Sequence, residues 1–477
     1  MQSQETKCIL RNAVLLAALL ASILQPSCSK KHTLGDGGRR SAGDAKNPTD
    51  SESDKVASEA EKKQSEEEEE STSQEPEAPR TVMLPAGLTL VTTGSVECGG
   101  AVNTGLRSEH IRVVFQENPA KEAYISWTTA TNTAANYVVF AKGTGEGGAN
   151  YQYKVDAQMN GPYQEGGQFY HHAKLENLAP ETAYYFVVVS DNQRSEEFNF
   201  KSAPSGESNI KFLSGGDSRS DPDQRLVMNR LMATLVTEQP DIIALLHGGD
   251  YVEDGGSWDE WDCWLINHQA TVNAAKRMLP VIPGRGNHES SPEFLNELFA
   301  SPGKGLQYYR VDIGTYTHFV LNSEISTEGD QAVWFEAELA KVSGKQRWIS
   351  AGYHTPAYPA VKTPGAAKQG FVPIIDKYRL DMVFESDGHA LKKTVPIRFD
   401  ALDAKDGTIY VGEGGLGVPQ RNAANADEWY FQNGGYAISG HHVQLVTMTP
   451  NEFTFSIVGE TKTIDPALGF KLTPRAR

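Results

Sequence analysis

The chain has 477 residues and a formal net charge of −17, which is enough length for two or three domains with hydrophobic cores. The acidic excess is uneven, because residues 44–80 hold thirteen acidic and five basic side chains. No basic face is present, so the composition argues against binding to nucleic acid.

The N-terminal 28 residues are expected to direct export. An apolar run at residues 14–24 follows two basic side chains; it is short for a membrane span and typical of a signal-peptide core. Cys28 comes shortly afterwards, so residues 1–28 resemble a bacterial lipoprotein signal with Cys28 as the lipidated residue. Gln25 and Pro26 depart from that pattern. We expect a protein that is either lipid-anchored in a bacterial cell envelope or secreted.

Residues 29–80 have almost no apolar side chains and are expected to form a disordered acidic tether. Any membrane contact would then be made through the lipid anchor alone. Beyond the tether the chain has two cysteines, Cys98 and Cys263. They could pair in an oxidising compartment or stay as two buried thiols, and the sequence leaves both alternatives open.

A small all-β domain is predicted at residues 107–205. Short alternating runs such as "IRVVFQ", "EAYISWTT" and "AYYFVVVSD" are separated by turns. Their number and length are typical of a fibronectin type III-like or immunoglobulin-like sandwich. His171 and His172 are neighbours, so on a strand they would point to opposite faces, and we interpret them as structural.

Strands alternate with helices in the following region, which we place at residues 208–462. The run "IKFLSGGD" is followed by a helical pattern, "DQRLVMNRLMATLVTEQ", and then by "DIIALLHGGD". This alternation predicts a βαβ arrangement in which helices cover the sheet.

Five apolar runs in this region stop shortly before side chains that can bind a metal ion. In open α/β sheets, ligands gather beyond the carboxyl ends of the strands, so these side chains are expected to converge. Glycines before several of them permit tight turns. The side chains are Asp217, Asp250, Asn287 with His288, His354, and Asp387 with His389.

The motifs that carry these residues resemble, in order, those of the calcineurin-like metallophosphoesterases. They are "GGDSR", "GGDYVED", "GNHE", "YHTPAY" and "SDGHALKKT". Within that superfamily the chain is most similar to the purple acid phosphatases, which carry a fibronectin-like domain before the catalytic one. The resemblance implies a hydrolase of phosphoric esters. Its catalytic domain would be an α/β sandwich of two β-sheets flanked by helices.

The resemblance also implies two divalent or trivalent metal ions, with iron, manganese, zinc and magnesium as candidates. Such a pair would activate a hydroxide for in-line attack on phosphorus. His288 would protonate the leaving oxygen or hold the substrate, or else make a structural contact. Asp217, Asp250 and His389 would hold the first ion, and Asp250, Asn287, His354 and Asp387 the second, with Asp250 as the bridge and a catalytic residue.

Two positions depart from the family pattern. Asp387 stands where the GHxH motif has its first histidine, and aspartate is itself a competent ligand. Glu253 stands where the family has the tyrosinate that gives its colour, while Tyr251 is at the wrong spacing. We therefore predict a protein that is not purple. An oxygen-rich site would favour manganese, magnesium or ferrous iron, and Glu253 would either bind metal or face solvent.

Three further features of the sequence lie near these motifs. Arg219 would bind a phosphate or form a surface ion pair. The glycine-rich run at 412–417 is interpreted as a turn near the edge of the sheet. The helical spacing of Trp258, Trp261 and Trp264 indicates core packing, with one ring near the mouth of the site.

The first functional hypothesis is an exported phosphatase acting on small phosphomonoesters. A phosphodiesterase or nucleotidase is the alternative among enzymes, since the same chemistry serves both. A non-catalytic surface binding protein is the alternative from another class. The oligomeric state stays open.

Overall fold

The computed structural model describes residues 81–99, 104–143, 151–289, 292–301, 305 and 307–475. The expected signal, Cys28 and the acidic tether lie outside the described residues. Across the described ranges, no helix has the length and apolar character needed to cross a membrane.

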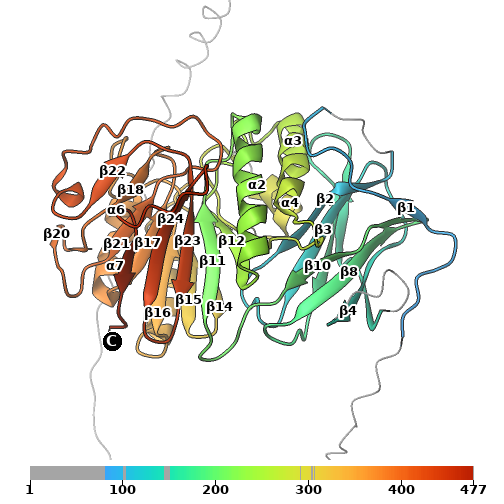
Figure 1. Cartoon of the computed structure of the whole chain (residues 1–477), viewed down its shortest axis with the longest axis horizontal. Coiled ribbons are helices and arrows are strands. Elements are labelled where there is room, and N and C mark those ends of the chain that lie inside the picture. Colours follow the sequence, from blue (N-terminus) through green and yellow to red (C-terminus); the bar gives the residue numbers. More distant parts are fainter. Residues whose placement is uncertain are drawn as a thin grey trace, which may run out of the picture. The chain divides into compact units, whose positions relative to one another are not determined.

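The N-terminal sandwich has one sheet of its own, with strand order β1-β9-β8-β4-β5 and β10 paired to β8. It lies at the blue-to-green end of the molecule in Figure 1. The segment before residue 107, which the sequence left unassigned, contributes β1 through parallel pairing with β9. The strands are β1 (Thr89–Val91), β4 (Asn136–Lys142), β5 (Tyr153–Asp156), β8 (Ala183–Ser190), β9 (Gln193–Ser195) and β10 (Phe198–Lys201).

The other layer of the sandwich continues into the C-terminal part of the chain. The strand order is β25-β24-β23-β11-β12-β13-β2-β3-β7-β6, and the join is a parallel pairing of Val281 in β13 with Val114 in β2. The two parts of the chain therefore share a sheet. Its strands are β2 (Leu106–Val114), β3 (Ala123–Thr129), β6 (Met159–Pro162), β7 (Phe169–Leu175), β11 (Ile210–Gly215), β12 (Ile242–His247), β13 (Val281–Pro283), β23 (His442–Met448), β24 (Phe453–Gly459) and β25 (Phe470–Leu472).

A further sheet faces this one, with strand order β14-β15-β16-β17-β21-β18-β22. A short hairpin, β19 with β20, lies outside it. The strands are β14 (Tyr309–Ile313), β15 (Tyr316–Val320), β16 (Trp348–Gly352), β17 (Met382–Glu385), β18 (Leu391–Lys393), β19 (Ile397–Arg398), β20 (Ala401–Leu402), β21 (Ile409–Gly412) and β22 (Tyr436–Ile438).

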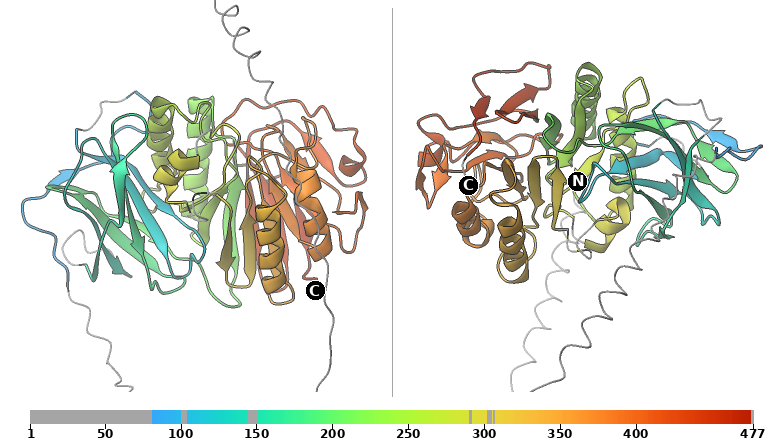
Figure 2. Two further views of the ribbon diagram at one scale, coloured as in Figure 1. Left: turned by 180° about the vertical axis from the view of Figure 1, so that it is seen from behind. Right: turned by 90° about the horizontal axis from the view of Figure 1, so that it is seen from below.

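Helices cover the outer faces of these sheets. Met228, Leu231 and Leu235 of α2 pack on the β11–β12 sheet, and Figure 1 shows α2 beside these strands. Phe335 and Ile375, from α5 and α7, pack on the other sheet, and these helices lie in front of it when seen from behind (Figure 2). The helices are α2 (Pro222–Glu238), α3 (Trp258–His268), α4 (Pro292–Phe299), α5 (Asp330–Val342), α6 (Ala367–Gly370) and α7 (Val372–Tyr378), with the short η1 (Gln269–Thr271) and η2 (Trp429–Phe431).

The main core lies between the two sheets. Phe212 of β11 stacks on Tyr316 of β15 at a centroid distance of 5.6 Å and also contacts Phe384 of β17. The resulting layer order is helix, sheet, sheet, helix, preceded by an all-β sandwich. This arrangement confirms the predicted fold class.

All five predicted strand ends exist. β11, β12 and β13 are parallel neighbours in one sheet, and β16 and β17 are parallel neighbours in the facing sheet. Their carboxyl ends therefore meet at one edge of the double layer. The loops at this edge carry the predicted ligands.

Cys98 and Cys263 form a disulfide, with Cα atoms 4.9 Å apart. Cys263 belongs to α3, whose Trp261 and Trp264 are buried in one cluster. The prediction of core packing for these rings is confirmed. Trp264 Nε1 also donates to the Ser218 hydroxyl at 3.0 Å, so this core supports the loop next to Asp217.

Candidate metal centre

His354 is the centre of one group of candidate ligands. Its Nε2 lies 3.1 Å from Asp250 Oδ1, 3.2 Å from Asn287 Oδ1 and 3.8 Å from Asp387 Oδ1. Two atoms that share a cation at about 2.1 Å lie roughly 3.0–3.5 Å apart in octahedral or tetrahedral geometry. The spacings of Asp250 and Asn287 from His354 therefore fit a shared metal ion, and Asp387 lies slightly farther away, within reach of the same position.

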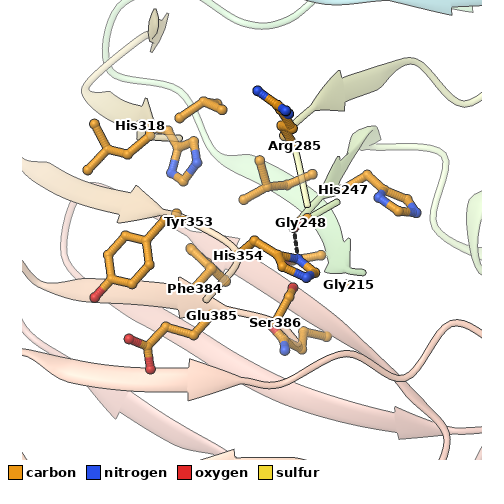
Figure 3. Close-up of a pocket in the computed structure, with 17 residues that line it drawn as sticks. Gly215, His247, Gly248, Arg285, His318, Tyr353, His354, Phe384, Glu385 and Ser386 are labelled. Atoms are coloured by element: carbon orange, nitrogen blue, oxygen red, sulfur yellow. Dashed lines mark hydrogen bonds between the residues drawn. The ribbon is translucent and has the colours of Figure 1, made fainter. Parts of the chain in front are cut away.

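A hydrogen bond to the backbone fixes the orientation of the His354 ring. Its Nδ1 donates to the Gly248 carbonyl at 2.8 Å, as the dashed line in Figure 3 shows. His354 lines a cavity that has room for about one water molecule and is also lined by His318, Tyr353 and Ser386. Since Nδ1 carries the donated proton, Nε2 faces the oxygen ligands, as a metal-binding imidazole requires.

Asp217 and His389 form the second group. His389 Nε2 lies 3.4 Å from Asp217 Oδ1, again a ligand-to-ligand spacing. The backbone N–H of Asp387 donates to both carboxylate oxygens of Asp217, at 3.1 and 3.2 Å, and holds that carboxylate in place. Donor atoms of Asp217, Asp250 and His354 all lie within 4.8 Å of one another, so the two groups adjoin.

The backbone at the candidate ligands is strained. Asp217, Asp250, Asp387 and His389 have φ angles of 57°, 58°, 68° and 58°, in the left-handed region that non-glycine residues seldom occupy. Residues in such conformations cost of order 1–3 kcal/mol each and cluster at functional sites. Positive φ occurs at other described residues too, but four of the candidate ligands share it at one edge of the double layer, as expected at a functional site.

Two glycines leave room for the carboxylates. A Cβ on Gly286 would lie 2.2 Å from Asp250 Oδ1, and a Cβ on Gly414 would lie 2.0 Å from Asp217 Oδ2. Gly414 belongs to the glycine-rich run at 412–417, which follows β21 in the middle of its sheet. β21 lies between β17 and β18 and is not an edge strand, so the interpretation of this run as a turn near the edge of the sheet is wrong. The run instead contacts the candidate metal centre, at Asp217.

Electrostatics in the site favour a bound cation. Burial raises the pKa of Asp250, but the charge and hydrogen bond of His354 outweigh burial and hold that pKa well below its ordinary value. Burial lowers the pKa of His354, but Asp250 and Asp217 outweigh it and raise that pKa well above its ordinary value. A site that attracts a proton this strongly to His354 would attract a metal ion for the same reason.

Glu289 supports the loops around Asp250 and was missed as a functional residue by sequence reasoning. Its carboxylate accepts from the backbone N–H groups of Asp250 at 2.9 Å, Tyr251 at 2.8 Å and Gly286 at 2.7 Å. Burial and the charge of Asp250 raise its pKa to about 7. The signal that could have found it is its place in "GNHE".

Arg219 lies inside the site. Its Nε donates to Asp250 Oδ2 at 3.0 Å, one terminal nitrogen lies 3.4 Å from His389 Nε2, and the other pairs with Glu253. Only 7% of the residue is exposed. Its guanidinium is therefore a buried cation beside the candidate ligands.

Glu253 faces Arg219 and the hydroxyl of Ser220, both of which donate to its carboxylate. Burial raises its pKa, but these hydrogen bonds and the charge of Arg219 leave the pKa below its ordinary value. Half of the side chain, 51%, is exposed. Metal binding by Glu253 stays a prediction, because its carboxylate already has these two partners.

Tyr251 points away from the centre. Its ring stacks on His247 at a centroid distance of 3.9 Å, and its hydroxyl donates to the Gly284 carbonyl at 3.1 Å. Burial raises its pKa well above the ordinary value. A tyrosinate ligand from this residue is therefore disfavoured.

His288 lies at the rim of the centre. Its backbone N–H donates to Asp250 Oδ1 at 3.1 Å, and its ring Nε2 lies 3.9 Å from Asp250 Oδ2. The ring Nδ1 donates to the Glu253 carbonyl. Because 22% of the side chain is exposed, the ring can meet a group that approaches from solvent.

Two further cations reach Asp387 and were not predicted. Lys362 Nζ forms an ion pair with its carboxylate, and a terminal nitrogen of Arg421 donates to its backbone carbonyl at 3.3 Å. Neither residue lies in a recognised motif.

Comparisons with known proteins agree with this arrangement. Residues 108–202 match the family described as purple acid phosphatase, N-terminal domain, and residues 184–391 match the calcineurin-like phosphoesterase family. An uncharacterised protein of Mycobacterium tuberculosis is 24% identical over 379 residues, covering 65% of this chain and 70% of that protein. Purple acid phosphatase 23 of Arabidopsis thaliana is 24% identical over 317 residues, covering 55% of this chain and 65% of the plant protein.

Solved structures share the fold. The purple acid phosphatase PPD1 from yellow lupin (Lupinus luteus) seeds superimposes with a TM-score of 0.66 at 16% identity, covering 76% of this chain and 74% of that chain. PhoD superimposes with a TM-score of 0.55 at 11% identity, covering 79% and 90%. At these identities the likeness concerns the fold, and the chemistry rests on the residues described above.

Proposed function

We propose that this chain, a purple acid phosphatase-like member of the calcineurin-like phosphoesterases, is an exported phosphatase. As a hydrolase of phosphoester bonds, it is proposed to act on phosphomonoesters. The observation that carries this proposal is the convergence of three oxygen ligands on His354 Nε2, at 3.1, 3.2 and 3.8 Å. Burying these carboxylates is costly, and a bound metal ion would add to the compensation that Arg219 and Lys362 give.

The ligand spacings support two metal ions, one in each group of side chains. Metal ions bound there would polarise the phosphoryl oxygens and lower the pKa of a coordinated water. Asp250 adjoins both groups and is the proposed bridge. The remaining ligands are Asp217 and His389 in one group and Asn287, His354 and Asp387 in the other.

Other residues of the chain bind the phosphoryl group and move protons. Arg219 holds a phosphoryl oxygen, because its planar guanidinium is buried beside Asp250 and matches the geometry of a phosphate. His288 gives a proton to the leaving oxygen. The fixed Nδ1 contact with Glu253 keeps its ring at the solvent-facing rim, where the leaving group must depart.

Export of the protein is proposed from residues 1–28, which lie outside the described residues. Lipidation of Cys28 would leave the acidic segment as a tether between membrane and enzyme. A Cys28→Ser variant expressed in a bacterial host tests this by fractionation. Membrane association that persists in the variant would contradict the lipid anchor.

The activity is tested with p-nitrophenyl phosphate after chelation and restoration of manganese, zinc or iron. The variant His354→Ala removes the central imidazole. The matched control is His441→Ala, which removes a ring that donates to the Val418 carbonyl outside the ligand groups. Metal-dependent turnover that collapses in the first variant and persists in the control supports the proposal. A folded chain inactive with every metal on monoesters contradicts it, and turnover of diesters alone would indicate a phosphodiesterase.

A further inference from the structure

Lys362 is a cation at the mouth of the site that the motifs do not include. Its Nζ pairs with Asp387 Oδ1, the atom that also lies 3.8 Å from His354 Nε2. The side chain of Lys362 is 39% exposed, whereas that of Asp387 is 5% exposed. Lys362 therefore reaches from the surface to the edge of the ligand group.

The loop that carries Lys362 is held by hydrogen bonds between side chains and its backbone. The amide of Asn425 donates to the carbonyls of Lys362 at 2.7 Å and Pro359 at 3.0 Å. The backbone N–H of Ala360 donates to the buried carboxylate of Glu413 at 2.9 Å. A lysine on a mobile loop would lose much entropy in binding an anion, whereas a lysine on an anchored backbone loses less.

Lys362 and Arg219 contact different candidate ligands. Arg219 contacts Asp250 and His389, and Lys362 contacts Asp387 beside His354. Arg219 is shared between Asp250 and Glu253, so two carboxylates compensate its charge. Among the described residues Lys362 has one carboxylate partner, Asp387, which is a proposed metal ligand, so its ammonium can bind a second substrate oxygen beside the one that Arg219 holds.

On the basis of the proposed function, we propose that Lys362 determines substrate specificity by selecting phosphomonoester dianions over phosphodiesters. A monoester carries close to two negative charges at neutral pH, because its second pKa is about 6. A diester carries one charge and presents a second ester substituent in place of the additional anionic oxygen. The ammonium of Lys362 can bind that oxygen by a charge-assisted hydrogen bond, which a diester lacks.

The test compares the metal-loaded full chain with Lys362→Met and Lys362→Arg on two substrates, p-nitrophenyl phosphate and bis(p-nitrophenyl) phosphate. The matched control is Lys377→Met, an exposed lysine of α7 that pairs with Glu336. We expect Lys362→Met to lower kcat/KM for the monoester about 10- to 100-fold, the range for a lost hydrogen bond to a charged group. The diester value should change less than about threefold, and Lys362→Arg should restore part of the loss.

Two readouts separate specificity from a structural role. Metal content of Lys362→Met, measured by plasma mass spectrometry, should equal that of the unmodified chain, and inhibition by inorganic phosphate should weaken by the same factor as monoester turnover. An unchanged ratio of monoester to diester activity would overturn the proposal. Loss of metal together with equal loss on both substrates would also overturn it, because Lys362 would then only hold Asp387.

Failure of the proposed function can be told apart from failure of this inference. If the unmodified chain hydrolyses neither substrate, calorimetric binding of inorganic phosphate to the metal-loaded chain still tests Lys362. Weaker binding in Lys362→Met and unchanged binding in Lys377→Met would support the role of Lys362 as the anion-recognising cation. Equal binding in both variants would overturn it.

Discussion

Asp387 Oδ1 lies 3.8 Å from Nε2 of His354. The distance brings the aspartate that stands in place of the family's first GHxH histidine into the group of candidate ligands. If Asp387 binds the metal as proposed, an oxygen ligand replaces a nitrogen ligand, which would alter the preference of the site for a metal without removing a donor.

The replacement of Asp387 by alanine tests this interpretation. Asp387→Ala should lower metal affinity and turnover by at least about 100-fold, since loss of a ligand exceeds the 10- to 100-fold cost of losing an outer partner. Asp387→His should retain metal binding and shift the preference towards zinc. Metal content and turnover of p-nitrophenyl phosphate measure both effects. Full metal binding by Asp387→Ala would place Asp387 outside the centre.

The colour of the iron-loaded protein is a second prediction. Glu253 occupies the tyrosinate position, and the hydroxyl of Tyr251 is bonded to the Gly284 carbonyl instead. The absorption spectrum of the ferric protein should therefore lack a strong visible band. Glu253→Tyr should gain such a band, which makes it the positive control. A purple unmodified protein would show that another tyrosine reaches the metal.

Lys392 should be needed for stability. It is fully buried with Glu385 and Glu413 and also donates to the Tyr358 carbonyl at 2.6 Å. Lys392→Met leaves two buried carboxylates without their cation, which should cost about 3–5 kcal/mol in the free energy of unfolding. Urea denaturation at pH 8 measures the loss.

Lys341→Met, which removes an exposed lysine of α5, is the control for this experiment and should change the free energy of unfolding by less than about 0.5 kcal/mol. Burial raises the pKa of Glu413 to about 7, although the charge of Lys392 acts against that rise. Without Lys392 the pKa of Glu413 should rise further, so the loss in the free energy of unfolding caused by Lys392→Met should shrink as the pH falls from 8 towards 7 and Glu413 becomes protonated in the variant. A deficit equal to that of the control would contradict the account of the buried network.

Stability should fall in acid because several histidines are buried in the neutral form. Burial lowers the pKa of His318 to about 3, from an ordinary value of 6.5. Its contribution to stability is complete above pH 6.5 and is lost as the pH falls towards 3, since the unfolded chain binds the proton first. Other buried histidines have pKa values lowered to about 3 or 4: His110, His171, His268 and His442.

The free energy of unfolding, measured in urea at pH 7, 6 and 5, checks this prediction. Each such histidine should add up to about 1.4 kcal/mol per pH unit to the slope below pH 6.5. His318→Gln should reduce the slope of the free energy of unfolding against pH by up to about 1.4 kcal/mol per pH unit, which corresponds to one bound proton. A stability that is constant from pH 7 to 5 would show that these rings are charged or hydrated in the folded protein.

The sequence was informative where local patterns determine structure. The strands that end before Asp217, Asp250, Asn287, His354 and Asp387 could be predicted, because apolar runs that stop at polar residues mark the carboxyl ends of buried strands. The order of the motifs then brought these residues into one site. The alternation of strands and helices predicted a sheet covered by helices, and the sandwich of two sheets was implied by the resemblance to the metallophosphoesterases.

Contacts between residues distant in sequence could not be predicted. Gly414 touches Asp217 because β21 lies centrally in its sheet, and the glycine-rich run alone does not encode that position. Burial of Arg219 and the reach of Lys362 also depend on loops from different parts of the chain. The pairing of Val114 with Val281, which joins the sandwich to the other strands, is equally nonlocal.

The most direct measurement is a titration of the chelated full chain with manganese, zinc or iron, following turnover of p-nitrophenyl phosphate against metal bound per chain. We expect turnover to be absent without metal and to reach its plateau at two ions per chain. A folded chain that binds no metal, or whose turnover is unaffected by chelation, would contradict the proposal of a metal-dependent phosphatase.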